Sequence, residues 1–188
     1  ISNLKEFSIL YQDRPILDNQ GGQLSAQLFY SWFVAKMMQP EIIIESGVWK
    51  GQGTWAFENA SPNSTIISLD PYLKNWQGYR SNKVTYIEGD FSQVDWSPIT
   101  NKENVLCFFD DHQDAAQRTI QCYQSGFKKM MFEDNYPPGQ GDCFSLKKLF
   151  FKFVFFFLNL ILWSNFYLSL NVNLISSFSF SILFLLYR

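Results

Sequence analysis

Hydrophobic residues in the first 135 positions fall into short apolar runs that alternate with stretches of helical spacing. The spacing of Leu28, Trp32 and Ala35 predicts a helix over residues 23–38, and similar patterns predict helices from Gln52 onward and over residues 114–125. Turn-forming residues are dense in the first 22 positions, which predicts a loop there. The apolar runs have the length of strands and cover residues 41–45, 65–69, 83–88, 105–109 and 129–132.

Short apolar strands that alternate with helices predict an α/β domain with a mainly parallel sheet and helical crossovers. Each predicted strand is followed by a carboxylate, and in such sheets ligands bind at the carboxyl ends of the strands. A single acid at such a place is commonly a helix cap. Acids at five equivalent places favour a ligand site instead; they are Glu45, Asp70, Asp90, the pair Asp110–Asp111 and the pair Glu133–Asp134.

A glycine-rich turn follows the first predicted strand. Gly47, Gly51 and Gly53 lie between Glu45 and a helical pattern. Strand, glycine turn and helix form the opening unit of nucleotide-binding α/β folds. Glycines let the backbone approach a ligand closely, and the helix start offers unpaired N–H groups. The turn therefore predicts a nucleotide-like ligand.

Length, net charge and cysteine content indicate the number of domains, the class of partner and the cellular compartment. A length of 188 residues predicts one folded domain. A net charge of -2 argues against a nucleic-acid binder that works by neutralising phosphates. Three cysteines without metal-site spacing indicate free thiols in a reducing compartment, which favours a cytoplasmic location. The sequence does not indicate an oligomeric state.

The chain changes character near residue 148. All 17 acidic residues lie between Glu6 and Asp142, and residues 153–187 carry no charge. We therefore divide the chain into an α/β domain, residues 1–148, and an apolar tail, residues 149–188. The tail is long enough for a membrane span, which would place the protein at a membrane. Its Phe, Leu, Ile, Asn and Ser are also what AT-rich codons yield, so translated non-coding sequence is the alternative that we favour.

Residues 19–139 resemble the class I S-adenosylmethionine-dependent methyltransferases, and more narrowly the metal-dependent branch of catechol O-methyltransferases and cephalosporin-hydroxylase-type proteins. The resemblance implies a Rossmann-like sheet of order 3-2-1-4-5 with helices on both faces. A complete member continues with a helix and two more strands, which this chain lacks. The motifs that carry the resemblance are Gly22-Gln23, Glu45-x-Gly47-x-x-x-Gly51-x-x-Thr54, Asp70, Asp90, Asp111-His112 and Asp134-Asn135.

The resemblance implies a site for S-adenosylmethionine. Glu45 and Gly47 would line the methionine part, and Asp70 would accept hydrogen bonds from the ribose hydroxyls. Asp90 would lie near the adenine, although a turn residue after Gly89 is an equal alternative. The implied cofactor-binding residues are Glu45, Gly47, Val48, Gly51, Thr54, Asp70 and Asp90.

The resemblance also implies a divalent metal ion. Oxygen ligands suit Mg²⁺ or a similar hard cation. Such an ion would lower the pKa of a substrate hydroxyl and hold its oxygen near the sulfonium methyl. A loop of helix caps and surface acids is the alternative. The expected ligands are Asp111, Asp134 and Asn135, with Asp110 and Glu133 as the alternatives in register.

One departure from the family pattern leaves the base open. Catechol O-methyltransferases have a lysine shortly after the Asp-His pair, and here Gln113 and Asp114 follow. Together with Asp111, His112 is the catalytic candidate, because its pKa lies near neutrality; it could instead orient Asp111 or simply pack. The predicted reaction is O-methylation of a small molecule or sugar hydroxyl. The alternatives are an NAD-type oxidoreductase, disfavoured by the glycine spacing, and an inactive membrane-associated relic.

Overall fold

The structure is a computed structural model that describes residues 1–73 and 77–168, with side chains described up to residue 158. Contacts divide the chain into two compact units, residues 1–148 and 149–188. That residues 149–188 are a membrane span or translated non-coding sequence stays a prediction.

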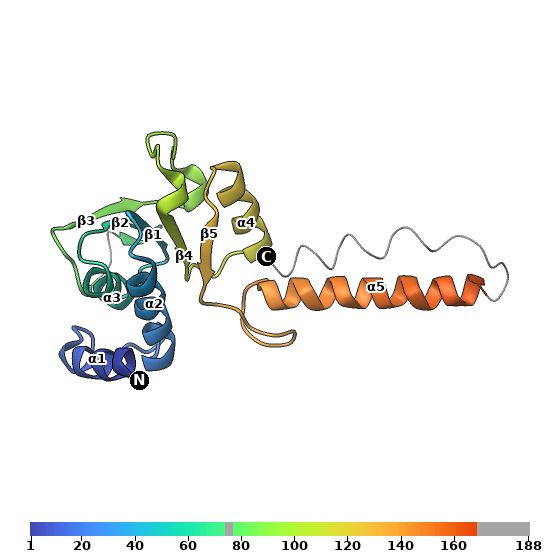
Figure 1. Cartoon of the computed structure of the whole chain (residues 1–188), viewed down its shortest axis with the longest axis horizontal. Coiled ribbons are helices and arrows are strands. Elements are labelled where there is room, and N and C mark those ends of the chain that lie inside the picture. The colour runs from blue at the N-terminus through green and yellow to red at the C-terminus, as the bar shows by residue number, and fades with distance from the viewer. Residues whose placement is uncertain (74–76, 169–188) are drawn as a thin grey trace. The chain divides into compact units, whose positions relative to one another are not determined.

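The first unit is built on one five-stranded sheet (Figure 1). All neighbouring strands are parallel, in the order β3-β2-β1-β4-β5. This confirms the predicted Rossmann-like α/β class and its strand order. Among the described residues no further strand joins the sheet beyond β5. The strands are β1 (Ile42–Ser46), β2 (Thr65–Asp70), β3 (Val84–Glu88), β4 (Val105–Phe109) and β5 (Lys129–Phe132).

Helices cover both faces of the sheet. Because successive side chains of a strand point to opposite faces, Ile43 and Phe108 belong to one core and Ile44 and Phe109 to the other. The first core lies under α1, α2 and α3, and the second under α4. The helices are α1 (Ser2–Leu10), α2 (Ser25–Met38), α3 (Gln52–Ala60), α4 (Ala115–Gln124) and α5 (Leu146–Leu168), with 3-10 turns η1 (Tyr11–Asp13), η3 (Phe91–Gln93) and η4 (Lys102–Asn104).

The register of the strands brings their carboxyl ends to one rim. Ser46 pairs with Leu69 of β2 and with Phe109 of β4, and Phe109 pairs with Phe132 of β5. The residues that follow at these strand ends therefore lie at similar heights. This is the edge of the sheet at which the sequence predicts a ligand site.

The loop predicted for residues 1–22 is wrong over its first half. Helix α1 occupies Ser2–Leu10 because Phe7 is buried against α2, where its ring lies 5.3 Å from Phe29 and 5.4 Å from Trp32. The densest cluster of turn-forming residues, at positions 14–22, lies beyond this helix. A tertiary contact therefore decides the conformation of a segment whose own pattern is weak.

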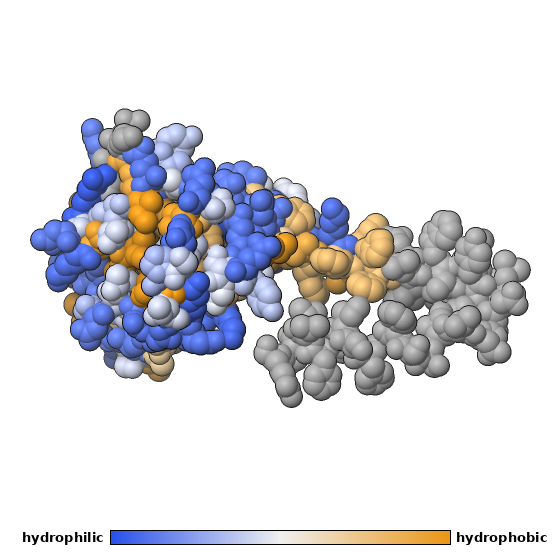
Figure 2. Space-filling view, turned by 90° about the horizontal axis from the view of Figure 1, so that it is seen from above, coloured by the Kyte–Doolittle hydropathy of each residue, from blue (hydrophilic) through white to orange (hydrophobic). Residues whose placement is uncertain are grey.

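The described part of α5 exposes a dense set of aromatic residues. Phe150, Phe151, Phe153, Phe155 and Phe156 are all exposed, and Figure 2 shows hydrophobic residues at the surface of the molecule in orange. Within residues 1–73 and 77–168, no helix combines the length and apolar character that a membrane crossing requires. The rest of the predicted span, beyond residue 168, lies outside the described residues.

Glu45 lies inside the protein, although the sequence places it at a strand tip facing a ligand. It shares the face of β1 that α3 covers, and only 1% of its surface is exposed. Thr54 Oγ1 and Ser68 Oγ donate to Glu45 Oε2 over 2.5 and 2.6 Å. Burial raises the pKa of Glu45 to about 7, although both hydroxyl donors oppose that rise.

We expect Glu45 to make the stability of the fold depend on pH. Its pKa is raised in the folded chain, so the folded state holds the proton more tightly than the unfolded state does. Its contribution is complete below the ordinary pKa of 4.5 and is lost as pH rises through about 7. The full difference corresponds to roughly 3 kcal/mol. Urea unfolding between pH 5 and pH 8 should show wild type losing stability relative to Glu45→Gln; parallel pH curves would contradict this.

Candidate functional site

A pocket opens at the carboxyl ends of the central strands. Its walls are the turn at Gly21–Gly22, the glycine turn after β1, the tip of β2 from Asp70 to Tyr72, and the tip of β4 from Asp110 to His112. These segments are far apart in sequence and meet here because β2, β1 and β4 are neighbours in the sheet. The pocket therefore lies where ligands bind in doubly wound sheets.

Gly47 makes the close approach that forms the pocket floor. Its φ is +92°, and a Cβ atom at this position would lie 2.0 Å from the carbonyl oxygen of Asp110. Its own N–H donates to the Leu69 carbonyl over 2.9 Å. No other residue type fits here without moving the tip of β4, so the structure accounts for the glycine that the sequence singled out.

Asp70 supports the glycine turn from the tip of β2. Its Oδ2 accepts a hydrogen bond from the Val48 N–H at 3.1 Å, and its Oδ1 accepts one from the Tyr72 N–H at 2.9 Å. The carboxylate still lines the pocket. Each oxygen has a second lone pair, so Asp70 can also accept hydrogen bonds from a bound ligand.

Aromatic side chains stand at the mouth of this pocket. Trp49 has a left-handed backbone, with φ +47°, and its indole N–H donates to the Gln20 carbonyl over 3.1 Å. This bond fixes the ring beside Gly21 and Gly22. Tyr72 also lines the pocket and is largely exposed. Flat rings at this place offer stacking surface to a ligand.

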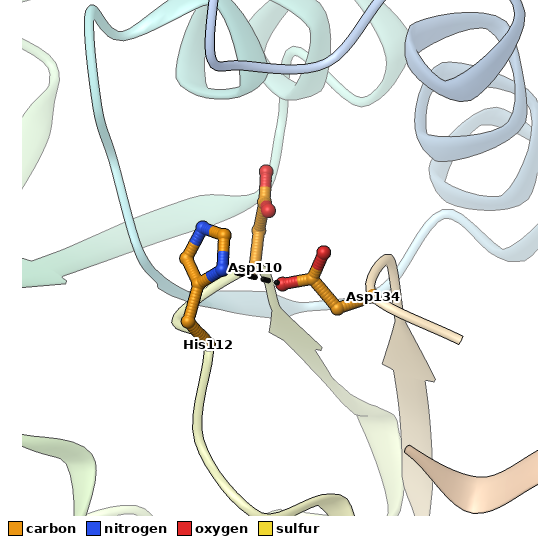
Figure 3. Close-up of side chains that lie close together, drawn as sticks. All are labelled: Asp110, His112 and Asp134. Atoms are coloured by element: carbon orange, nitrogen blue, oxygen red, sulfur yellow. Dashed lines mark ion pairs between the residues drawn. The ribbon is translucent and has the colours of Figure 1, made fainter. Parts of the chain in front are cut away.

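Three potential metal ligands converge at the tips of β4 and β5. One ligand atom from each of Asp110, His112 and Asp134 lies within 4.8 Å of the other two (Figure 3). Of the expected ligand set, this group contains Asp134 and the alternative Asp110, and it adds His112. It does not include Asp111 or Asn135.

The charge balance of this group suits a divalent cation. Asp134 is 8% exposed, and its Oδ2 has no hydrogen-bond partner among the described residues. His112 Nδ1 lies 3.4 Å from that oxygen, an ion-pair distance without hydrogen-bond geometry. Burial and the charges of Glu133 and Asp134 raise the pKa of Asp110 well above its usual range. A cation at this point would reduce the repulsion among the carboxylates and would give Asp134 Oδ2 a partner.

His112 contacts two acids, Asp134 and Asp142, through one ring nitrogen, Nδ1. Its φ of +55° turns the chain sharply after Asp111, and its Nδ1 lies 2.9 Å from Asp142 Oδ1. The hydrogen bond with Asp142 and the neighbouring carboxylates raise the pKa of the imidazole. The surrounding acids therefore favour the protonated form of the His112 imidazole.

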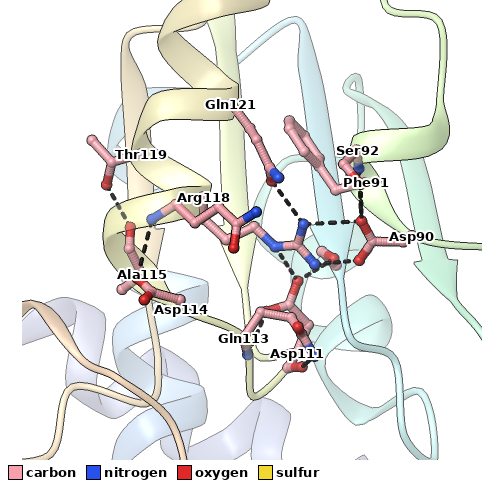
Figure 4. Close-up of polar contacts among 12 residues, drawn as sticks. Asp90, Phe91, Ser92, Asp111, Gln113, Asp114, Ala115, Arg118, Thr119 and Gln121 are labelled. Atoms are coloured by element: carbon pink, nitrogen blue, oxygen red, sulfur yellow. Dashed lines mark hydrogen bonds and ion pairs between the residues drawn. The ribbon is translucent and has the colours of Figure 1, made fainter.

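Asp111 and Asp90 are engaged by Arg118 of α4 (Figure 4). Arg118 Nε donates to Asp111 Oδ2 at 2.9 Å, and Nη1 and Nη2 form a bidentate pair with Asp90. Ser46 Oγ also donates to Asp111 Oδ2, at 2.6 Å. The side chain of Arg118 is 4% exposed, and the guanidinium holds the pKa of Asp90 far below its usual range. Both acids thus have a permanent partner.

The other predicted site residues have structural contacts. Thr54 lies in the core with Glu45, and Gly51 begins α3. Asn135 Oδ1 accepts the Lys147 N–H at the start of α5. Glu133 is half-buried beside Asp134, and burial raises the pKa of its carboxyl group.

Arg118 was missed by the sequence analysis, although a signal existed. Ala115, Arg118 and Cys122 share one face of α4, and all three are buried. A charged residue at a core position of a helix is rarely left unpaired. The sequence therefore contained a hint that Arg118 meets acids at the strand tips.

Comparisons with known proteins concern the fold. No family model matches the chain, and a search of curated proteins finds no match. A search of solved structures finds the SAH-bound methyltransferase PaMTH1 of Podospora anserina, with 17% identity over 71% of this chain and a TM-score of 0.49. It also finds an O-methyltransferase from Bacillus cereus in complex with SAH, with 13% identity over 68% of this chain and a TM-score of 0.42.

A structure titled as CmcI with Mg and SAM is similar as well, with 16% identity over 60% of this chain and a TM-score of 0.44. The chain covers 62% of PaMTH1, 62% of the Bacillus cereus protein and 55% of CmcI. Two of these structures are named as methyltransferases. At such identities the similarity describes the fold, and the activity is argued from the residues of this chain.

We expect Gly47→Ala to destabilise the protein far more than Gly139→Ala does. Both glycines have a φ near +85°, with values of +92° and +81°, so both substitutions carry a backbone cost of roughly 1–2 kcal/mol. Only at Gly47 does the new Cβ meet backbone; at Gly139 nothing lies within 4 Å. Urea unfolding of the two variants measures the difference. Equal losses would show that the close approach to Asp110 is unimportant.

Removing the Arg118 side chain should leave two acids uncompensated. Arg118→Met is expected to cost roughly 3 kcal/mol, near the low end for a buried pair because Asp90 keeps some solvent contact. Lys128→Met removes an exposed pair with Glu103 and should leave stability unchanged. Chemical denaturation of both variants at low ionic strength is the measurement. A loss in Arg118→Met no larger than in Lys128→Met would refute the buried role.

Proposed function

We propose that the protein transfers a methyl group from S-adenosylmethionine to a hydroxyl group of a small molecule or sugar, with help from a divalent metal ion. One observation carries the proposal. One pocket is lined by the glycine turn, Asp70, Asp110 and His112, and a carboxylate oxygen of Asp134 lies within 4.8 Å of the potential ligand atoms of Asp110 and His112. The residues proposed to bind the cofactor and those proposed to bind the metal ion therefore lie close together.

The cofactor would lie along the tips of β1 and β2. The backbone at Gly47 carries no side chain that would keep a ligand away. Asp70 would accept hydrogen bonds from the ribose hydroxyls, while it continues to hold the Val48 N–H. Trp49 and Tyr72 would shield the bound molecule at the mouth. Glu45 would act from the core, by supporting β1 beneath the turn.

The metal ion would be held by Asp110, His112 and Asp134. Carboxylates suit Mg²⁺ and Mn²⁺, and an imidazole widens the choice toward transition metals. When bound, such an ion lowers the pKa of a coordinated hydroxyl group. Asp111 would remain with Arg118 and Ser46 and would hold the tip of β4 in place.

The reaction itself needs an oxygen nucleophile in line with the methyl group. The oxygen attacks the methyl carbon, the carbon–sulfur bond breaks, and S-adenosylhomocysteine leaves. The hydroxyl proton passes to a base at the rim. Asp110, His112 and Glu133 are titratable groups at this place with raised pKa values. Glu133 is not one of the proposed metal ligands and could accept the proton, whereas His112 could do so only as an uncharged imidazole that is not a metal ligand.

Cofactor and metal binding test the proposal directly. We expect the full chain to bind S-adenosylhomocysteine in calorimetry and Mn²⁺ in an electron paramagnetic resonance titration. Asp70→Asn should weaken binding of S-adenosylhomocysteine about tenfold, because it loses a charged acceptor. Binding of NADH without S-adenosylhomocysteine would support an oxidoreductase instead, and binding of neither would support an inactive relic.

The same Mn²⁺ titration shows whether Asp110 or Asp111 binds the metal ion. Asp110→Asn should weaken Mn²⁺ binding at least tenfold, since it removes one of two carboxylate ligands. Asp111→Asn should bind Mn²⁺ within about twofold of wild type, although it should unfold more easily because Arg118 loses a partner. The opposite ranking would return the ligand role to Asp111.

A further inference from the structure

A buried glutamine connects the start of α2 to the metal group. Gln23 is 5% exposed, and its Nε2 donates to Asp110 Oδ2 over 3.2 Å. Its Oε1 accepts a hydrogen bond from Ser31 Oγ at 2.7 Å. Ser31 lies two turns into α2 and is fully buried. The two bonds form a chain from the core of the helix to a carboxylate at the tip of β4.

This chain of hydrogen bonds favours one orientation of the Gln23 amide, with its NH₂ end toward Asp110. Ser31 Oγ has a second acceptor in the Gln27 carbonyl at 3.2 Å, but the contact with Gln23 is the shorter one. A hydroxyl that donates to Oε1 holds the oxygen end away from the site. The NH₂ end then points at the carboxylate. With Asp110 ionised, as it must be to bind a cation, the reversed amide would set its oxygen against a carboxylate oxygen, which is unfavourable.

We propose that Gln23, held by Ser31, is a positioning residue that orients the Asp110 carboxylate for metal binding. The inference rests on the proposed function, because it assigns Gln23 a role toward the same metal ion. A carboxylate can rotate about its last bond, and a donor on one of its oxygens limits that rotation. Groups that orient metal ligands in this way commonly change metal affinity 10- to 100-fold when they are removed.

Burial alone does not explain the geometry of Gln23. An apolar side chain of similar size would fill the same space, and it would leave Asp110 with one donor fewer. The chain contains a second buried glutamine with a different arrangement. Gln52, at the start of α3, is 2% exposed; its Oε1 accepts the Ile16 N–H, and its Nε2 has no partner within the described part of the chain. Gln52 therefore serves as a matched control.

The test is a Mn²⁺ titration, followed by electron paramagnetic resonance, of the full chain and three variants. Gln23→Leu should weaken Mn²⁺ binding at least tenfold. Ser31→Ala should weaken it by a smaller factor, because the amide stays but loses its anchor. Gln52→Leu should bind Mn²⁺ as wild type does, although it loses a buried hydrogen bond and should melt at a lower temperature.

The outcomes separate this inference from the proposed function. If wild type and Gln23→Leu bind Mn²⁺ equally, the positioning role is refuted and the metal site stands. If wild type binds no Mn²⁺, the metal part of the proposed function fails, and this inference fails with it. If Gln23→Leu does not fold, judged by circular dichroism, Ser31→Ala decides: unchanged affinity in that variant overturns the role. Equal weakening in Gln52→Leu also overturns it, because the effect would then follow from lost stability.

Discussion

The pocket depends on the close packing of two backbones at the centre of the sheet. Gly47 lies against the carbonyl of Asp110, and its N–H is bonded to the carbonyl of Leu69. Parallel pairing at the same register on both sides of β1 makes this contact possible. Through Gly47, the end of β1 therefore contacts the ends of β2 and β4. The ribose-type acid after β2 and the metal-type group after β4 therefore share one rim, although 40 residues separate Asp70 from Asp110 in sequence.

The sequence predicted the framework well because that part of the fold follows from local patterns. Apolar runs of strand length gave all five strands to within a residue at each end, as in Val105–Phe109 and Lys129–Phe132. The glycine turn and Asp70 also lie where the pattern indicated. Helix α1 was missed because its stability comes from Phe7 against α2, and a contact between distant segments leaves little trace in local composition.

The details of the site could not be predicted, because adjacent residues at a strand tip differ only in direction. Asp110 and Asp111 are both acids, and spacing alone does not decide which one faces a metal ion. The structure separates them through Arg118, which lies seven residues beyond Asp111 along the chain, and through Gln23, 87 residues before Asp110. Glu45 shows the same limit, since its place in the core depends on the face of β1 that α3 covers.

The negative charges of the two groups of acids at this rim are compensated in different ways. This difference allows one group to stabilise the fold while the other is available to a ligand. Asp90 and Asp111 share a guanidinium that is always charged and is sealed from solvent. Asp110 receives a hydrogen bond from the neutral Gln23 amide, and Asp134 forms an ion pair with His112, whose charge depends on its proton and whose side chain is half exposed. The first group fixes the tips of β3 and β4 at any pH near neutrality. The second contains carboxylates that a cation could neutralise, which is what the proposed metal site requires.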